Sequence, residues 1–279
     1  MSCGTQRTKP TVPEIVDSKD DVKGSQKTLP KIGMILGPGG LRAFGHLGVL
    51  REFERAQIPI HSIAGIEWGS LVAGLYAHKS KSHDVEWKLQ KLKSDHIPQK
   101  TLFNSKINPA NLEKINEFLK TVFDDKGRGA IEFGCSTINK NSGAIRWLSG
   151  NGSIDQVKQC LPFPPIFQSR GGWASYASDL SGVAQKLKDG GADVIVYVNV
   201  IGDANWSQMK SMENNETEQL LWWEVQKHLA SQFNTVDWVV NVSLGNADVL
   251  DFDRRKSFVL TGQQAGLYVA KKITSKYGF

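Results

Sequence analysis

The sequence predicts an α/β fold in which helices cover a mostly parallel sheet. Short apolar runs, such as residues 31–37 and 58–65, alternate with segments whose apolar residues have helical spacing. Both runs end in a glycine-containing turn, and a helical segment follows each turn. Strands that alternate with helices in this way form parallel sheets through right-handed crossovers. Because no repeat or internal linker interrupts the pattern, we expect residues 31–279 to form one domain.

The rest of the chain continues the alternation. A Lys-rich helical region covers residues 80–125, and two strands flank the turn at residues 139–143. A helix near residues 153–160 stops at a Pro-rich loop, and the Val-rich run at residues 191–200 predicts a buried strand. The C-terminal part has the pattern of a helix, a strand and a helix.

Composition restricts the classes of function. A net charge of +6 suits an anionic membrane surface or simply a Lys-rich solvated surface. No Arg-rich or aromatic-interleaved cluster indicates binding to nucleic acid, which we therefore exclude as a partner. The three cysteines form no disulfide framework, and no Cys/His pair has metal-ligand spacing, so neither a metal nor a cofactor is expected. No run approaches the ~20 apolar residues of a membrane span.

Residues 1–30 are polar, rich in Pro, Ser and Lys, and without periodicity, which predicts a disordered N-terminal tether. Cys3 and the glycine after it resemble the mature start of a bacterial lipoprotein, whose cysteine carries a lipid anchor. An ordinary disordered N-terminus with a chance cysteine fits equally well. The two interpretations place the protein either at a bacterial membrane, anchored through Cys3, or in the cytoplasm as a soluble protein.

The glycine-rich turn after the first strand resembles a nucleotide-binding loop, but two motifs fail there. A dinucleotide fingerprint needs glycine at the position of Arg42, and a phosphate loop needs lysine at the position of His46. What remains is a glycine turn that enters a helix with its backbone N–H groups exposed, and such a turn can hold a developing oxyanion. The candidate oxyanion-loop residues are Gly37, Gly39, Gly40, Leu41 and Arg42.

The turn after the second strand has the frame Gly-x-?-x-Gly, which in acyl hydrolases presents a serine nucleophile. Here Gly65 and Gly69 enclose Glu67 at the nucleophile position. Both turns follow neighbouring parallel strands, so they meet at the C-terminal edge of the sheet, where α/β folds place their sites. A glycine N–H cradle beside such an elbow is the layout of an acyl hydrolase.

Residues 33–77 resemble the start of the patatin-like phospholipases, which have a G-G-x-R-G loop, then H-x-G-V-L, then G-x-S-x-G and a small-residue helix. Ala43 replaces one glycine of this pattern. The later segments CLPFPPIFQ, GADVIVYVNV and DFDRRKSFVLTGQQAG are similar to further parts of the family, so the resemblance covers roughly residues 31–279. It implies a three-layer α/β/α fold with a mostly parallel central sheet, and a serine–aspartate dyad that acts on acyl esters. The directly matching residues are Gly39, Gly40, Arg42, His46, Gly48, Val49 and Leu50.

Neither dyad residue is found at its expected position. Ser70 lies one helical turn beyond Glu67 and points elsewhere, so it does not replace the serine. Asp189 begins an apparent D-G-G motif, but it lies between a helix and the following strand, at the opposite edge of the sheet from the elbow. Counting back along that helix places the aspartate position at Ala174 or Ser175.

Asp179 is the nearest aspartate to that position, and we match it to a later residue of the family's loop. A carboxylate at position 67 would give an anhydride if it attacked an ester. As a base it would be weakened, because N–H donors at a helix start favour the ionised form. We therefore expect Glu67 to be ionised and hydrogen-bonded by the Gly39–Gly40 loop, by its own helix start, or by both.

The sequence is compatible with two functions, so it leaves open whether the chain is an enzyme. The first is a catalytically inactive protein that binds a lipid, an acyl group, a membrane surface or a protein partner. The second is a lipid acyl hydrolase of unusual chemistry.

Overall fold

The computed structural model describes residues 28–79, 81–98, 112–123, 129, 131–164, 166–202 and 216–279, the side chains of residues 216 and 217 excepted. Its centre is a mixed, mostly parallel sheet with the strand order β4-β3-β2-β1-β6-β7, and β5 pairs with β3. The neighbours β3-β2-β1-β6-β7 pair in parallel, whereas β4 and β5 run antiparallel to β3. The strands are β1 Ile32–Leu36, β2 Ile60–Gly65, β3 Glu132–Asn139, β4 Ile145–Gly150, β5 Trp173–Ser175, β6 Val194–Asn199 and β7 Trp238–Asn241.

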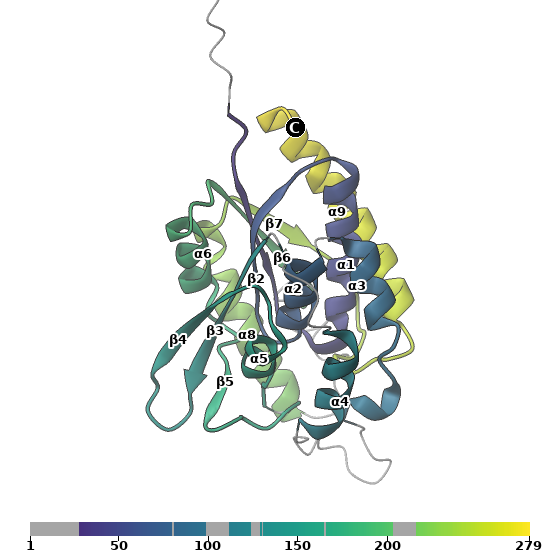
Figure 1. Ribbon diagram of the computed structural model, residues 1–279, viewed down its shortest axis with the longest axis vertical. Coiled ribbons are helices and arrows are strands. Elements are labelled where there is room, and N and C mark those ends of the chain that lie inside the picture. Colours follow the sequence, from purple (N-terminus) through teal and green to yellow (C-terminus); the bar gives the residue numbers. More distant parts are fainter. Residues whose placement is uncertain are drawn as a thin grey trace, which may run out of the picture.

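Helices cover both faces of the sheet (Figure 1). α6 and α8 lie on one face, and α1, α2, α3 and α9 lie on the other. Right-handed crossovers produce this arrangement, because the chain moves outward from β1 through β2 to β3 and later returns to β6 and β7. The helices are α1 Phe44–Arg55, α2 Trp68–Lys79, α3 Ser82–Leu89, α4 Glu113–Val122, α5 Ile154–Cys160, α6 Leu180–Asp189, α8 Glu216–Ala230 and α9 Arg255–Tyr277, with short 3-10 turns at Gly40–Ala43, Ser94–His96 and Phe233–Thr235.

The neighbouring inner strands β1 and β6 are buried along their whole length. Parallel strands covered on both faces have continuous apolar sequences, which is why these two were recognisable from the sequence. The predicted three-layer α/β/α architecture with a mostly parallel sheet is confirmed. The first 27 residues, which include Cys3 and most of the predicted tether, lie outside the described part of the chain.

α1 and α9 pack at very close range through glycines on both helices. A Cβ atom on Gly48 would overlap the carbonyl oxygen of Val259, and one on Gly262 would overlap the carbonyl oxygen of Gly45. On Gly266, a Cβ atom would lie 2.8 Å from the Cα atom of Val49. Backbone therefore contacts backbone along this crossing, and larger residues would force the helices apart.

Cys135 in β3 and Cys160 at the end of α5 form a disulfide. Their Cα atoms are 6.1 Å apart, and both residues are buried. We expected no disulfide framework from the three cysteines, and this pair corrects that expectation. An odd count does not identify a pair, because the pairing depends on how β3 and α5 meet in space.

None of the helices in the described ranges is long and apolar enough to cross a membrane.

Candidate functional site

The elbow between β2 and α2 holds Glu67 in a strained backbone conformation. Glu67 has a φ of 54°, in the left-handed region that non-glycine residues rarely adopt. A Cβ atom on Gly65 would overlap the backbone of Ser70, and one on Gly69 would overlap the carbonyl oxygen of Leu36. The frame glycines are thus required by close packing of the turn on itself and on the end of β1.

The glycine loop cradles the Glu67 side chain. Gly39 and Gly40 have φ values of 148° and 57°, and their backbone N–H groups both donate to Oε2 of Glu67 at 2.9 Å. This confirms the predicted hydrogen bonding of Glu67 to the glycine loop. A further hydrogen bond holds the loop: the carbonyl oxygen of Val249 accepts from the N–H of Leu41 at 2.7 Å.

Arg42 connects the glycine loop to the segments that follow β6 and β7. Its fully buried guanidinium donates to three carbonyl oxygens, those of Val200 at 2.7 Å, Ile201 at 2.9 Å and Ala247 at 3.0 Å. These acceptors lie at least 158 residues away in the chain. Arg42 therefore fixes the position of the glycine turn that carries the two N–H donors.

His46 holds the start of the same loop. Its Nε2 atom lies 2.9 Å from the carbonyl oxygen of Gly37, and burial lowers the pKa of His46 to about 4. The ring is therefore neutral at pH 7. Because a carbonyl oxygen can only accept, Nε2 carries the proton and donates it to Gly37.

Of the two positions predicted for the missing aspartate, Ser175 contacts the elbow. Its Oγ accepts from the backbone N–H of Glu67 at 2.8 Å, and its own N–H donates to the carbonyl oxygen of Pro162 at 2.6 Å. Ala174 is buried beside it in β5, where it pairs with Ile138 of β3. The sequence contains no signal for the Ser175 bond, because it depends on an antiparallel strand of three residues.

The other two aspartates serve local structure. Asp189 ends α6, before β6, and it accepts from the side chain of Gln185 at 2.8 Å. It is therefore at the N-terminal end of β6, the edge opposite the elbow. Asp179 is the N-cap of α6 and accepts from the N–H of Gly182 at 3.0 Å and from the hydroxyl of Ser136 at 2.7 Å.

The expected ionisation of Glu67 needs correction. Burial raises the pKa of Glu67 from 4.5 to about 7, against the lowering effect of the N–H groups of Gly39, Trp68 and Gly40. Its pKa therefore lies close to neutral pH instead of well below it. The sequence indicated the donors but not the depth of burial, and here burial has the larger effect. Oε1 is buried without a hydrogen-bond partner of good geometry among the described residues.

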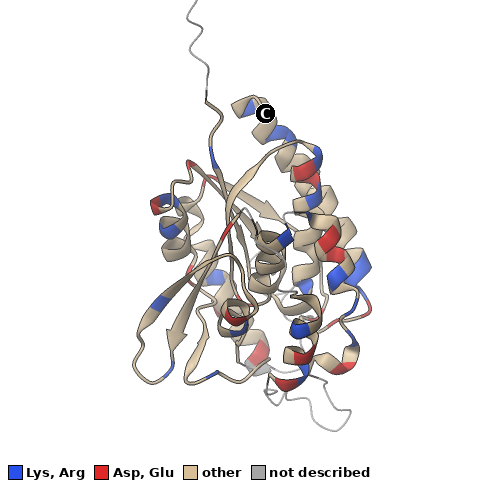
Figure 2. Ribbon diagram, in the orientation of Figure 1, with Lys and Arg blue, Asp and Glu red and all other residues tan. Residues whose placement is uncertain are grey.

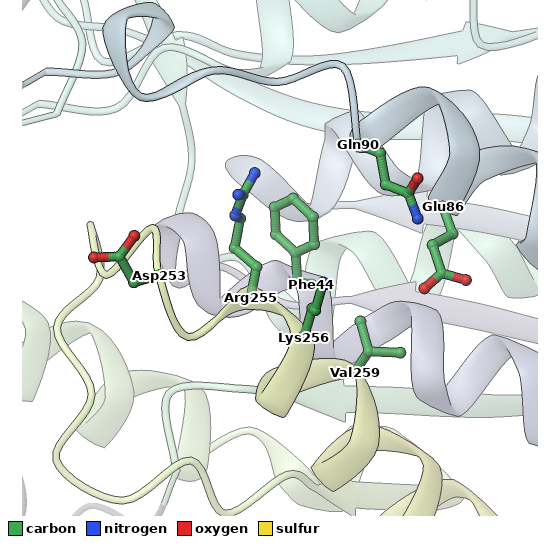
Figure 3. A pocket seen from close by; sticks show the side chains of 7 residues that line it. All are labelled: Phe44, Glu86, Gln90, Asp253, Arg255, Lys256 and Val259. Atoms are coloured by element: carbon green, nitrogen blue, oxygen red, sulfur yellow. The ribbon is translucent and has the colours of Figure 1, made fainter.

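A cavity of about 530 Å³ lies outside this cradle, between α1, α3 and the start of α9 (Figure 3). Arg255 and Phe44 lie side by side within it, and Asp253 points away from them. Two contacts with Phe252 anchor Arg255. Its side chain donates to the carbonyl oxygen of Phe252 at 2.5 Å, and its guanidinium carbon lies 3.2 Å from the centroid of the Phe252 ring. The buried Glu67 does not line this cavity, whose lining residues are Phe44, Glu86, Gln90, Asp253, Arg255, Lys256 and Val259.

No protein-family model matches the chain. Curated fungal proteins named lysophospholipase NTE1 do match. The protein of Mycosarcoma maydis is 50% identical over 50 residues, which is 18% of this chain and 3% of that protein. The protein of Coccidioides immitis is 28% identical over 185 residues, which is 61% of this chain and 11% of that protein. The protein of Neurospora crassa is 24% identical over 184 residues, again 61% of this chain, and 12% of that protein. The chain therefore spans a small fraction of these relatives' length.

Among solved structures, VipD from Legionella pneumophila has the same fold, with a TM-score of 0.50 and 11% sequence identity. The match covers 88% of this chain and 67% of VipD. Because the curated relatives above are fungal, they give no support to a bacterial lipoprotein anchor at Cys3. The glycine loop and elbow resemble the start of the patatin-like phospholipases, the chain is similar to fungal lysophospholipases over 61% of its length, and it shares the α/β fold of VipD.

Proposed function

We propose that this chain is a catalytically inactive member of the patatin-like phospholipase family that binds a lipid or an acyl group instead of hydrolysing it. One observation carries the proposal: Oε2 of Glu67 occupies the two N–H donors of Gly39 and Gly40. In an acyl hydrolase such donors must be available to the oxygen of the tetrahedral intermediate, which becomes negatively charged. A carboxyl oxygen already bonded to both donors takes its place.

The remaining machinery also lacks the required chemistry. Hydrolysis through an acyl-enzyme needs a nucleophile and a base within hydrogen-bond reach of each other. Glu67 replaces the nucleophile, and the residue that reaches the elbow from β5 is Ser175, whose hydroxyl cannot act as a base at neutral pH. A lipid is the proposed ligand because the matching relatives are named lysophospholipases.

Hydrolysis of lysophosphatidylcholine and of a chromogenic short-chain ester tests the proposal. We expect the wild type and Glu67→Ser to stay at the uncatalysed background. We expect Glu67→Ser/Ser175→Asp to gain measurable turnover, since it supplies both a nucleophile and a carboxylate at the contacting position. The matched control Glu67→Ser/Ser181→Asp adds the same groups but places the aspartate on the exposed start of α6. This control should remain inactive.

A second measurement follows lysophosphatidylcholine binding to the wild type by calorimetry, where we expect saturable binding without turnover. The contrary result is turnover by the wild type that disappears in Glu67→Gln. It would support the alternative, an acyl hydrolase in which Glu67 acts as a general base on water. A pKa of about 7 would suit Glu67 to that role, because a base is most effective when its pKa is near the working pH.

A further inference from the structure

The outer face of α9 exposes large apolar side chains. Leu260, Leu267 and Tyr268 are 61%, 44% and 63% exposed, and they supply three of the seven large apolar residues found exposed in the described part of the chain. Their spacing of seven and eight residues places them on the same side of the helix. Apolar residues clustered on one exposed face indicate an interaction surface more strongly than single exposed ones do.

Lysines flank these apolar residues, and acidic residues are absent from the sequence of this segment. From residue 255 to residue 279 the sequence has five basic residues and no Asp or Glu. Figure 2 shows the basic positions toward the two ends of α9. Lys256 and Lys271 are exposed on the same side as Leu260 and Leu267, and the 15-residue spacing puts them roughly 22 Å apart. We call Lys256, Leu260, Leu267, Tyr268 and Lys271 the α9 surface.

The packing of α9 keeps this surface turned outward. The opposite side of the helix carries Gly262 and Gly266, which contact the backbone of α1. Phe258 and Ile273 on that side are buried in the core. The helix cannot rotate to hide its leucines without losing this close contact, so the α9 surface is a permanent feature of the fold.

We propose that the α9 surface docks onto an anionic lipid membrane. Leucine and tyrosine side chains can enter the boundary between headgroups and acyl chains, while lysines at either end bind lipid phosphates and carboxylates. Charge complementarity selects this occupant over a second copy of the chain. A symmetric dimer through the α9 surface would bring its own lysines together with no acidic residue of α9 to neutralise them. An anionic membrane supplies both the apolar layer and the negative charge.

This inference goes beyond the proposed function and does not depend on Glu67, because the α9 surface lies on the outer side of α9 and Glu67 is fully buried. The Glu67→Ser variant should therefore bind membranes like the wild type. Failure of the ligand-binding proposal would leave membrane docking unaffected, and the converse also holds.

Co-sedimentation with vesicles tests the proposal. One set of vesicles contains phosphatidylcholine alone, and the other contains phosphatidylcholine with phosphatidylserine. We expect binding to the second set only, weakening as salt is added. Lys256→Gln/Lys271→Gln should weaken binding about 25-fold, from about fivefold for each lysine near an anionic surface. Leu260→Ser/Leu267→Ser should weaken it by more than about tenfold, from the lost apolar burial.

Two double variants serve as matched controls. Lys114→Gln/Lys120→Gln removes two exposed lysines from α4, and Ile145→Ser/Leu220→Ser removes two exposed apolar residues from β4 and α8. Both should bind like the wild type. Equal binding to the two kinds of vesicle, or weakening by the controls as large as by the α9 variants, would overturn the proposal. So would a wild-type dimer that Leu260→Ser/Leu267→Ser converts to a monomer, because a second copy would then cover the α9 surface.

Discussion

The hydroxyl oxygen of Ser175 accepts a hydrogen bond from the backbone N–H of Glu67 at 2.8 Å, although 108 residues separate the two in the chain. Through this bond the short strand β5 supports the strained elbow from one side, while Gly39 and Gly40 hold the Glu67 side chain from the other. The backbone and the side chain of Glu67 are thus fixed by different parts of the fold, and each can be removed separately.

Ser175→Ala should lower the free energy of unfolding by about 1–3 kcal/mol, because the buried N–H of Glu67 would lose its acceptor. Urea unfolding measures the change. The control Ser181→Ala, at an exposed position on α6, should stay within about 0.5 kcal/mol of the wild type. Equal stability of the two variants would show that the bond contributes nothing.

Glu67 should make stability fall as pH rises. Its pKa is about 7 in the folded chain against an ordinary 4.5, so the folded state retains the proton over a range in which the unfolded state has lost it. The contribution is complete below pH 4.5, declines between 4.5 and 7, and amounts to about 3 kcal/mol. Glu67→Gln does not titrate, so its unfolding free energy should lack this decline. Parallel curves for the two proteins between pH 4.5 and 8 would contradict the prediction.

His46 should have the opposite effect on stability. Its pKa is about 4 in the folded chain against an ordinary 6.5, so the unfolded state binds the proton first as pH falls. Its contribution is complete above pH 6.5 and is lost between 6.5 and 4, by about 3 kcal/mol. In the wild type the two residues therefore offset each other between pH 4.5 and 6.5. In urea unfolding at a series of pH values, His46→Gln should reveal the fall with rising pH that Glu67 causes, and Glu67→Gln should reveal the rise.

Gly40→Ala should destabilise the fold by more than about 3 kcal/mol, because the added Cβ would overlap the carbonyl oxygen of Val249 as well as require a positive φ. Gly245→Ala is the matched control, since Gly245 has a φ of 61° and nothing within 4 Å of an added Cβ. It should lose only about 1 kcal/mol from backbone strain. Thermal or urea unfolding of both variants isolates the effect of the overlap, and similar losses would show that Val249 does not confine the loop.

Reduction of the Cys135–Cys160 disulfide should lower the unfolding free energy by about 3 kcal/mol, the loop-closure effect for a separation of 25 residues. Urea unfolding with and without reductant measures this. In Cys135→Ala/Cys160→Ala the reductant should have no effect on the unfolding free energy. If it lowered the unfolding free energy of this variant as much as that of the wild type, the effect would come from Cys3. Peptide mapping without reductant should recover the two cysteines in one linked fragment.

The order of the elements and the meeting of the glycine loop with the elbow followed from the sequence, because both turns follow neighbouring parallel strands and therefore lie at the same edge of the sheet. Other features had no sequence signal. The partners of Arg42 are backbone carbonyls, which every residue possesses, and the bond from Glu67 to Ser175 requires an antiparallel strand after the Pro-rich loop. The pKa of Glu67 depended on burial competing with hydrogen bonds, and the motif indicated the hydrogen bonds alone.

The close contact of α1 with α9 has a consequence for the order in which the protein can fold during synthesis. α1 is synthesised before α9, and its glycine-lined side finds its partner only when residues 255–277 have been made. β1 likewise lies between β2 and β6, and β6 is synthesised some 160 residues later. Until those residues have been made, a nascent chain therefore presents an incomplete sheet and an uncovered α1. Chaperones that shield apolar surface would have the greatest effect on this protein before α9 emerges.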